Sequence, residues 1–179
     1  MVVVGLGGVG SHAVSLLARS GVGRIRVIDF DRVTLSSLNR HAFATRADVG
    51  ASKAACVQSH LARVVPRTEV EAVEALFSGD QAKALLLGEQ SLPARCPDLV
   101  LDCIDNVPSK IELLLYCHRE KIPVLSSMGA ASRIDPTRVS IADIGNTREC
   151  ELARAVRKGL RREGVLGNIP VVFSIERIR

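Results

Sequence analysis

The sequence is poor in aromatic residues and has no tryptophan: aromatics make up 3% of its 179 residues. A hydrophobic core must therefore rest on Val, Leu, Ile and Ala, and side chains that could stack on nucleic-acid bases are few. Tyr116 and Phe173 are the weak candidates for that role. No apolar run approaches the roughly 18 residues that a membrane helix needs, and no signal peptide precedes the first glycines. We therefore expect an intracellular chain without membrane contact.

Cysteine is present, but not in the pattern of a structural zinc site. None of the five cysteines forms a C-x-x-C pair, the spacing typical of thiolate zinc ligands. An odd number without a secretory leader indicates reduced thiols, most of which we interpret as small core residues. The net charge of +5 favours a polyanionic partner.

Short β-rich runs alternate with helical patterns along the chain. This alternation predicts an α/β fold: a Rossmann-like, doubly wound, mainly parallel sheet with helices on both faces. Strands are expected at 2–4, 24–29, 69–73, 99–104, 123–128, 138–141 and 171–174, and helices at 11–20, 52–65, 80–87, 108–120 and 151–163. We interpret residues 1–179 as a single domain. Neither end carries a polar tail, which favours a fragment lacking N- and C-terminal segments.

A glycine-rich turn joins the first expected strand to the first expected helix. Gly5, Gly7 and Gly10 satisfy G-x-G-x-x-G, and Gly8 adds a further glycine. Such a turn predicts a nucleotide phosphate at the helix N-terminus. Asp29, at the end of the second strand, is placed to accept hydrogen bonds from ribose hydroxyls. This pattern alone fits NAD or FAD as well as ATP.

Further motifs in the first two thirds of the chain resemble those of the ThiF/MoeB family, the bacterial relatives of ubiquitin-activating enzymes. They follow the glycine turn in the family's order: D-x-D at 29–31, N-R at 39–40, G-x-x-K at 50–53 and D-x-x-D-N at 102–106. The resemblance implies that ATP adenylates a carboxylate, releasing pyrophosphate.

The same resemblance implies roles for particular residues. Arg40 and Lys53 would act on the triphosphate as catalytic cations, and Asn39 would help to place the phosphates. Asp105 would be catalytic as the Mg²⁺ ligand, and Asn106 would lie beside the adenosine. The alternatives are that Arg40 and Lys53 are solvated surface charges and that Asp105 caps the helix near Pro108.

The second half resembles the tRNA threonylcarbamoyladenosine dehydratases within that family, and the missing C-x-x-C pairs agree. The resembling stretches are 121–125, 128–132, 134–137 and 170–176. The resemblance implies that ATP activates the threonylcarbamoyl carboxylate on adenosine 37 of tRNA and that an internal ureido atom closes a ring as AMP leaves. It also implies a homodimer, in the cytoplasm or, for eukaryotic members, associated with mitochondria.

Five cations recur at helical spacing near the C-terminus and predict a tRNA-binding face. They lie at i, i+3, i+4, i+7 and i+8, which places them on one side of a helix. A polyanion would relieve their mutual repulsion; the alternative is a solvated face. The five are Arg154, Arg157, Lys158, Arg161 and Arg162.

Other functions fit parts of the sequence. One is an adenylating activator of a ubiquitin-like or sulfur-carrier protein, with Cys150 as acceptor thiol. A second is an inactive, nucleotide-binding scaffold subunit. The third is a dinucleotide oxidoreductase, which the glycine turn alone would favour.

Overall fold

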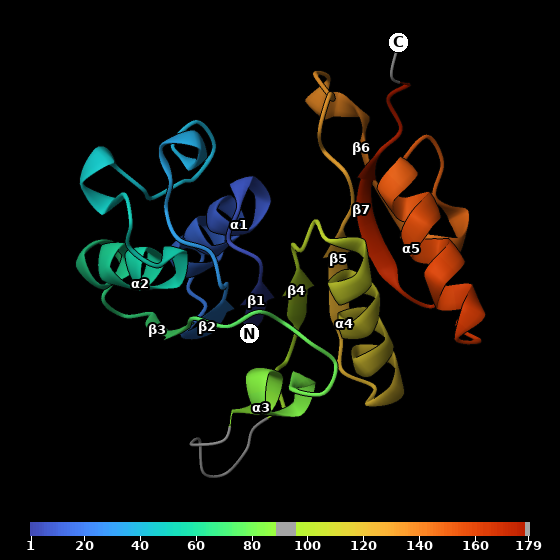
Figure 1. Cartoon of the computed structure of the whole chain (residues 1–179), viewed down its shortest axis with the longest axis horizontal. Helices are drawn as coiled ribbons and strands as arrows, with labels where there is room; N and C mark the ends of the chain where they lie inside the picture. Colours follow the sequence, from blue (N-terminus) through green and yellow to red (C-terminus); the bar gives the residue numbers. More distant parts are fainter. Residues whose placement is uncertain (89–95, 178–179) are drawn as a thin grey trace.

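A seven-stranded sheet forms the centre of the computed structural model, which describes residues 1–88 and 96–177. The strand order is β3-β2-β1-β4-β5-β7-β6, and every pair is parallel except β6 with β7 (Figure 1). The bounds are β1 Val2–Val4, β2 Arg24–Ile28, β3 Glu69–Val73, β4 Val100–Asp102, β5 Val124–Ser127, β6 Val139–Asp143 and β7 Pro170–Ser174. This confirms the predicted doubly wound sheet. The chain end at 178–179, on which the expectation of a fragment partly rests, lies outside the described residues.

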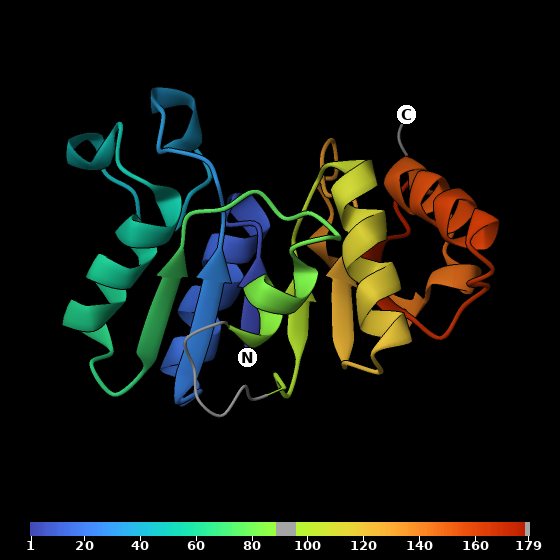
Figure 2. The ribbon, with the colours of Figure 1, turned by 60° about the horizontal axis from the view of Figure 1, so that its bottom comes forward.

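Helices cover both faces of the sheet, and each face has its own apolar core (Figure 2). One core joins β1 and β2 to α1 and α2, and the other joins the opposite face of β1 and β2, with β4, β5 and β7, to α3, α4 and α5. The bounds are α1 Gly8–Arg19, α2 Lys53–Val64, α3 Ala82–Leu87, α4 Val107–Arg119 and α5 Glu151–Arg162. Across the described ranges, no helix has the length and apolar character needed to span a membrane.

Two element ends differ from the sequence prediction for identifiable reasons. α1 begins at Gly8 rather than at residue 11, because the glycines of the turn adopt helical geometry despite their low helix propensity. β4 ends at Asp102 rather than at residue 104, because the Asp102 carboxylate accepts a hydrogen bond from the Ile104 N–H (3.1 Å) and turns the chain. Ser52 caps α2 as predicted, accepting from the Ala55 N–H.

Gly159, a residue unfavourable in the middle of a helix, lies where α5 crosses α4. A Cβ atom at Gly159 would overlap the side chain of Ile111 on α4. Ala153, Val156 and Leu160 are also buried, and they direct the apolar side of α5 into the core that it shares with α4. The absence of a side chain therefore permits the close approach of the two helices.

Candidate functional site

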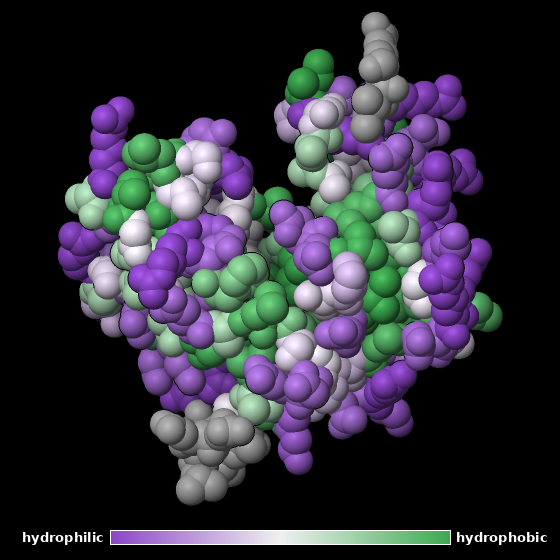
Figure 3. Space-filling model, viewed as in Figure 1, coloured by the Kyte–Doolittle hydropathy of each residue, from purple (hydrophilic) through white to green (hydrophobic). Residues whose placement is uncertain are grey.

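The glycine turn after β1 and the turn after β4 meet at the carboxyl edge of the sheet. The strand order reverses between these two neighbouring strands, and ligands of doubly wound sheets bind at such a reversal. Figure 3 shows a deep notch in the upper edge of the molecule, between the segment that joins β2 to α2 and the segment that joins β5 to β6. The predicted site residues of the first two thirds of the chain belong to the elements around this edge.

The glycines of the turn have different physical roles. Gly5 has a φ of +89°, and a Cβ there would lie 2.7 Å from the Cys103 carbonyl oxygen. A Cβ at Gly10 would overlap the Gly5 carbonyl oxygen, and one at Gly8 would lie 3.3 Å from the side chain of Arg40. Gly7, in contrast, has nothing within 4 Å of its Cβ position. Gly5 and Gly10 thus allow close packing, while Gly7 leaves room for a phosphate at the uncapped start of α1.

Asp29 holds the glycine turn against the end of β2. Its side chain is buried, and Oδ2 accepts from the Leu6 N–H at 2.5 Å while Oδ1 accepts from the Asp31 N–H at 2.7 Å. Burial raises the pKa of Asp29, whereas these two hydrogen bonds and the Lys53 charge oppose the rise. The predicted contact with ribose stays a prediction. That Asp29 also anchors the turn could not be predicted from the sequence, because Leu6 is a partner in space.

Lys53 is a nearly buried cation rather than a solvated surface charge. Its side chain is 8% exposed, and Nζ lies 2.6 Å from Oδ2 of Asp31, whose side chain is 47% exposed. Asp31, the second acid of the D-x-D motif, had no assigned role in the sequence analysis. It keeps the ammonium group of Lys53 at the start of α2. A bound phosphate could there replace the Asp31 carboxylate as the partner of this ammonium group.

Arg40 and Asn39 lie together beside the glycine turn. The Arg40 side chain packs over Gly8, and its Nη1 donates to the Ser36 carbonyl (2.9 Å) and to Asn39 Oδ1 (3.1 Å). The segment is tied to α1 because Ser11 Oγ accepts from the Ala42 N–H at 3.0 Å. The structure therefore brings both predicted phosphate ligands to the N-terminus of α1.

His41 is a buried residue of this segment that the sequence analysis missed. It is 6% exposed, and Nδ1 accepts from the N–H groups of Phe43 (3.3 Å) and Ala44 (3.1 Å). A neutral ring bonded in this way carries its proton on Nε2. That atom is buried and has no partner within the described ranges, so it is a donor left for a ligand oxygen or an ordered water. Burial, followed by the Lys53 charge, lowers the pKa of His41 to about 4.

The low pKa of His41 predicts a loss of stability in acid. Between the ordinary value of 6.5 and about 4, the unfolded chain takes up a proton that the folded protein does not, so stability falls as the pH falls. The full gap corresponds to about 3 kcal/mol. We expect His41→Gln to remove this component, measured as the difference between the two proteins in free energy of unfolding at neutral pH and at about pH 4. Parallel pH profiles would contradict the assignment.

Asp105 and Asn106 follow β4 and have different environments. Asn106 caps α4, with Oδ1 accepting from the Ser109 N–H at 3.2 Å, so the alternative that Asp105 is the cap is wrong. Asp105 is exposed, and within residues 1–88 and 96–177 no hydrogen bond or ion pair engages its carboxylate. The same ranges hold no cluster of three or more His, Cys, Asp or Glu side chains suited to a metal. One carboxylate fits Mg²⁺, which binds through one or two carboxylates plus substrate phosphates.

The predicted tRNA-binding residues all lie on α5, at the right of the molecule in Figures 1 and 3, where hydrophilic side chains gather. Arg157 is half-buried and donates to the carbonyls of Ile144 (3.3 Å) and Thr147 (3.1 Å). It therefore holds the segment before α5 in place. The remaining four cations, Arg154, Lys158, Arg161 and Arg162, are exposed, and we call them the α5 basic face.

Cys150 lies under the start of α5. Its side chain is buried, and Sγ accepts from the Ala153 N–H at 3.5 Å as the helix cap. A thiol in this position is not available to accept an acyl group from a carrier protein.

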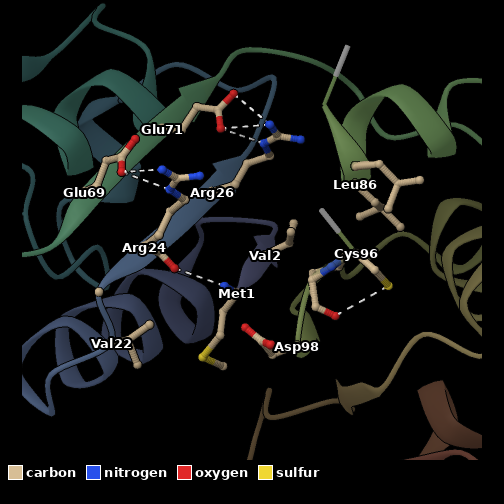
Figure 4. Close-up of a pocket in the computed structure, with 13 residues that line it drawn as sticks. Met1, Val2, Val22, Arg24, Arg26, Glu69, Glu71, Leu86, Cys96 and Asp98 are labelled. Carbon is tan, nitrogen blue, oxygen red and sulfur yellow. Dashed lines mark hydrogen bonds and ion pairs between the residues drawn. The ribbon is translucent and has the colours of Figure 1, made fainter. Parts of the chain in front are cut away.

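A separate cavity of about 470 Å³ lies at the opposite, amino edge of the sheet (Figure 4). Its cations are already paired across β2 and β3, Arg24 with Glu69 at 2.9 Å and Arg26 with Glu71 at 2.8 Å. None of the predicted site residues lines it. The chemistry expected from the sequence belongs to the carboxyl edge.

Comparisons with known proteins agree with this geometry. tRNA threonylcarbamoyladenosine dehydratase 2 of Saccharomyces cerevisiae is 45% identical over 177 residues, which are 99% of this chain and 38% of that protein. The chain thus spans less than half the length of this relative. The Escherichia coli molybdopterin-synthase adenylyltransferase is 38% identical over 135 residues, 75% of this chain and 50% of that protein.

A solved structure extends the similarity to three dimensions. The structure of E. coli tRNA N6-threonylcarbamoyladenosine dehydratase in complex with ATP has a TM-score of 0.88 and 34% identity, over 99% of this chain and 73% of that one. The model of the ThiF family matches residues 1–175, nearly the whole sequence. The chain therefore belongs to the ThiF family.

Proposed function

We propose that this chain is the ATP-binding adenylation domain of a tRNA threonylcarbamoyladenosine dehydratase. The observation that carries the proposal is the extent of the similarity. The yeast dehydratase matches 99% of the chain, whereas the molybdopterin-synthase adenylyltransferase matches 75%. The quarter of the chain that the adenylyltransferase leaves unmatched is thus matched by the dehydratase.

The arrangement at the carboxyl edge supports the adenylation step of this reaction. A carboxylate oxygen of the substrate attacks the α-phosphorus of ATP, and the bond from that phosphorus to the pyrophosphate oxygen breaks. Negative charge then gathers on pyrophosphate, so fixed cations near it lower the barrier. Arg40 packs over Gly8, and Lys53 pairs with Asp31, whose N–H donates to the Asp29 carboxylate that anchors the glycine turn. Mg²⁺ held by Asp105 would neutralise phosphate charge and orient the leaving group.

Ring closure then needs no nucleophile from the protein. An internal atom of the ureido group attacks the acyl adenylate, and AMP leaves. Buried Cys150 agrees with such a route and gives no support to a carrier-protein thioester. The homodimer, the carrier-protein partner and the cellular compartment expected from the sequence stay predictions.

Turnover by the full-length protein tests the proposal. We expect tRNA that carries threonylcarbamoyladenosine at position 37 to stimulate release of AMP and pyrophosphate, and mass spectrometry of the digested tRNA to show loss of one water. The same tRNA without the modification is the control. ATP binding without cleavage in the presence of the modified tRNA would contradict the proposal and favour an inactive scaffold subunit.

The α5 basic face is the proposed contact with the tRNA backbone. Replacing Arg161 and Arg162 by Gln would remove two exposed cations. The slope of log affinity against log salt is negative, and each lost phosphate contact reduces its steepness by about 0.9, so we expect the slope to become less steep by about 2. Filter binding of tRNA at several salt concentrations measures it. Arg63→Gln with Arg67→Gln, two exposed arginines near the end of α2, is the matched control, and an equal change in both pairs would argue against a specific contact.

A further inference from the structure

A fully buried ion pair lies directly behind the turn that carries Asp105. Oδ2 of Asp102 accepts from Lys110 Nζ at 2.7 Å and from Ser126 Oγ at 2.5 Å, while Oδ1 accepts from the Ile104 N–H at 3.1 Å. The side chains of Asp102 and Lys110 both have 0% exposure. Because no solvent reaches them, neither side chain can touch a substrate in this arrangement.

Stability alone is a poor explanation for this pair. Desolvating two charges costs free energy that their attraction rarely exceeds, and apolar residues of similar volume are often as stable or more so. The elements that carry the pair contribute to an apolar core, since Val100 of β4 and Leu113 and Leu114 of α4 are buried in it. Burial raises the pKa of Asp102, and the Lys110 charge acts against that rise. What the pair provides is a fixed geometry for the elements that it joins.

Three elements converge on Asp102, and all three border the turn. Asp102 ends β4, Lys110 lies in α4, and Ser126 lies on β5 next to β4. The intervening turn, 103–106, also supports the nucleotide loop. The Cys103 carbonyl oxygen lies 2.7 Å from the Cβ position of Gly5, and Cys103 Cβ lies 3.2 Å from that of Gly10. A shift of Asp102 would therefore move both the back of the glycine turn and the carboxylate of Asp105.

We propose that Asp102, Lys110 and Ser126 form a buried positioning network that fixes Asp105 for the cation that accompanies the nucleotide. The inference rests on the proposed function, since it requires a nucleotide with a divalent cation at this edge. The network acts through Asp105 and the turn. It therefore affects how nucleotide binding depends on the cation, and it does so without contacting the nucleotide or the cation directly.

Ser126→Ala provides the mildest test, because it removes one hydrogen bond and keeps the ion pair. Calorimetry would measure ATP binding by the full-length protein as a function of Mg²⁺ concentration. Loss of a supporting partner behind a metal ligand typically weakens metal affinity 10- to 100-fold, so we expect the Mg²⁺ concentration for half-maximal binding to rise about 10-fold. Binding of ATP in EDTA should change little.

A matched control separates positioning from stability. Thr68→Val removes another buried hydroxyl, which donates to the Val22 carbonyl at 2.9 Å, before β3. It should lower the unfolding temperature as Ser126→Ala does but leave the Mg²⁺ dependence unchanged. The double variant Asp102→Asn/Lys110→Met removes both buried charges, and it should fold yet keep the raised Mg²⁺ requirement.

The possible outcomes distinguish the two proposals. If Ser126→Ala and the double variant shift the Mg²⁺ dependence no more than Thr68→Val, the network is only structural and the inference is overturned. If the wild-type protein binds ATP equally well with and without Mg²⁺, the inference alone fails; if it binds no ATP under either condition, the proposed function fails as well.

Discussion

Replacing Lys53 by Met is expected to lower the rate of pyrophosphate release from ATP about 100- to 1000-fold, the usual effect of removing one pre-organised group that stabilises transition-state charge. The ammonium group is held in a nearly dry position with Asp31 as its ion-pair partner. A charge fixed in this way acts more strongly on a triphosphate than a solvated one. Single-turnover measurement of pyrophosphate with modified tRNA would report the chemical step.

The expected loss is not a consequence of unfolding. Met retains the apolar stem of Lys53, and Asp31 is exposed enough to be solvated once its partner has gone, so we expect a stability change below about 1 kcal/mol. Lys83→Met, which changes an exposed lysine of α3, is the matched control and should be neutral. Release within tenfold of the wild-type rate in Lys53→Met would show that the triphosphate does not depend on this cation.

Two alanine substitutions in the glycine turn should have different effects, one on stability and the other on nucleotide binding. In Gly10→Ala the new methyl group would overlap the Gly5 carbonyl oxygen, and backbone cannot move aside as a flexible side chain can. We expect a loss of stability at or above about 3 kcal/mol, the upper end for overpacking. Gly7→Ala should fold like the wild-type protein, because nothing lies within 4 Å of its Cβ position.

Nucleotide binding distinguishes these two variants further. The methyl group of Gly7→Ala would occupy the open space in front of the turn, so we expect ATP affinity to fall about tenfold or more, equivalent to roughly 1.4 kcal/mol. Denaturant unfolding together with calorimetric titration of ATP would measure both properties. If Gly7→Ala bound ATP with wild-type affinity, the phosphates would not lie in the open space beside Gly7.

Most of the fold could be predicted from the sequence because its signals are local. The bounds of β3, 69–73, agree with the structure, and Ser52 caps α2 as expected. The glycine turn, Arg40, Lys53 and Asp105 were found through motifs whose members are close in sequence, and the fold brings these motifs to one edge.

The missed features depend on neighbours in space. Ser126 meets Asp102 because β5 pairs with β4 in a register that no local pattern specifies. Arg157 fits the helical pattern of the cations, yet carbonyl groups of the segment before α5 engage it. His41 looks like any polar residue in a loop, and its burial follows from the way that loop folds back over α1. Such partners become visible only when the tertiary structure is known.

The parallel pairing of β1 with β4 also affects how the protein is made. Its register joins Val2 to Val100 and Val4 to Asp102, so it closes a loop of more than half of the 179 residues. Contacts between residues so distant in sequence form late, because the entropy of the intervening chain must be lost first. A growing chain that has left the ribosome only as far as β3 would already contain the glycine turn, but it would lack the turn against which Gly5 and Gly10 pack. Nucleotide binding during synthesis should therefore begin only after β4 has emerged.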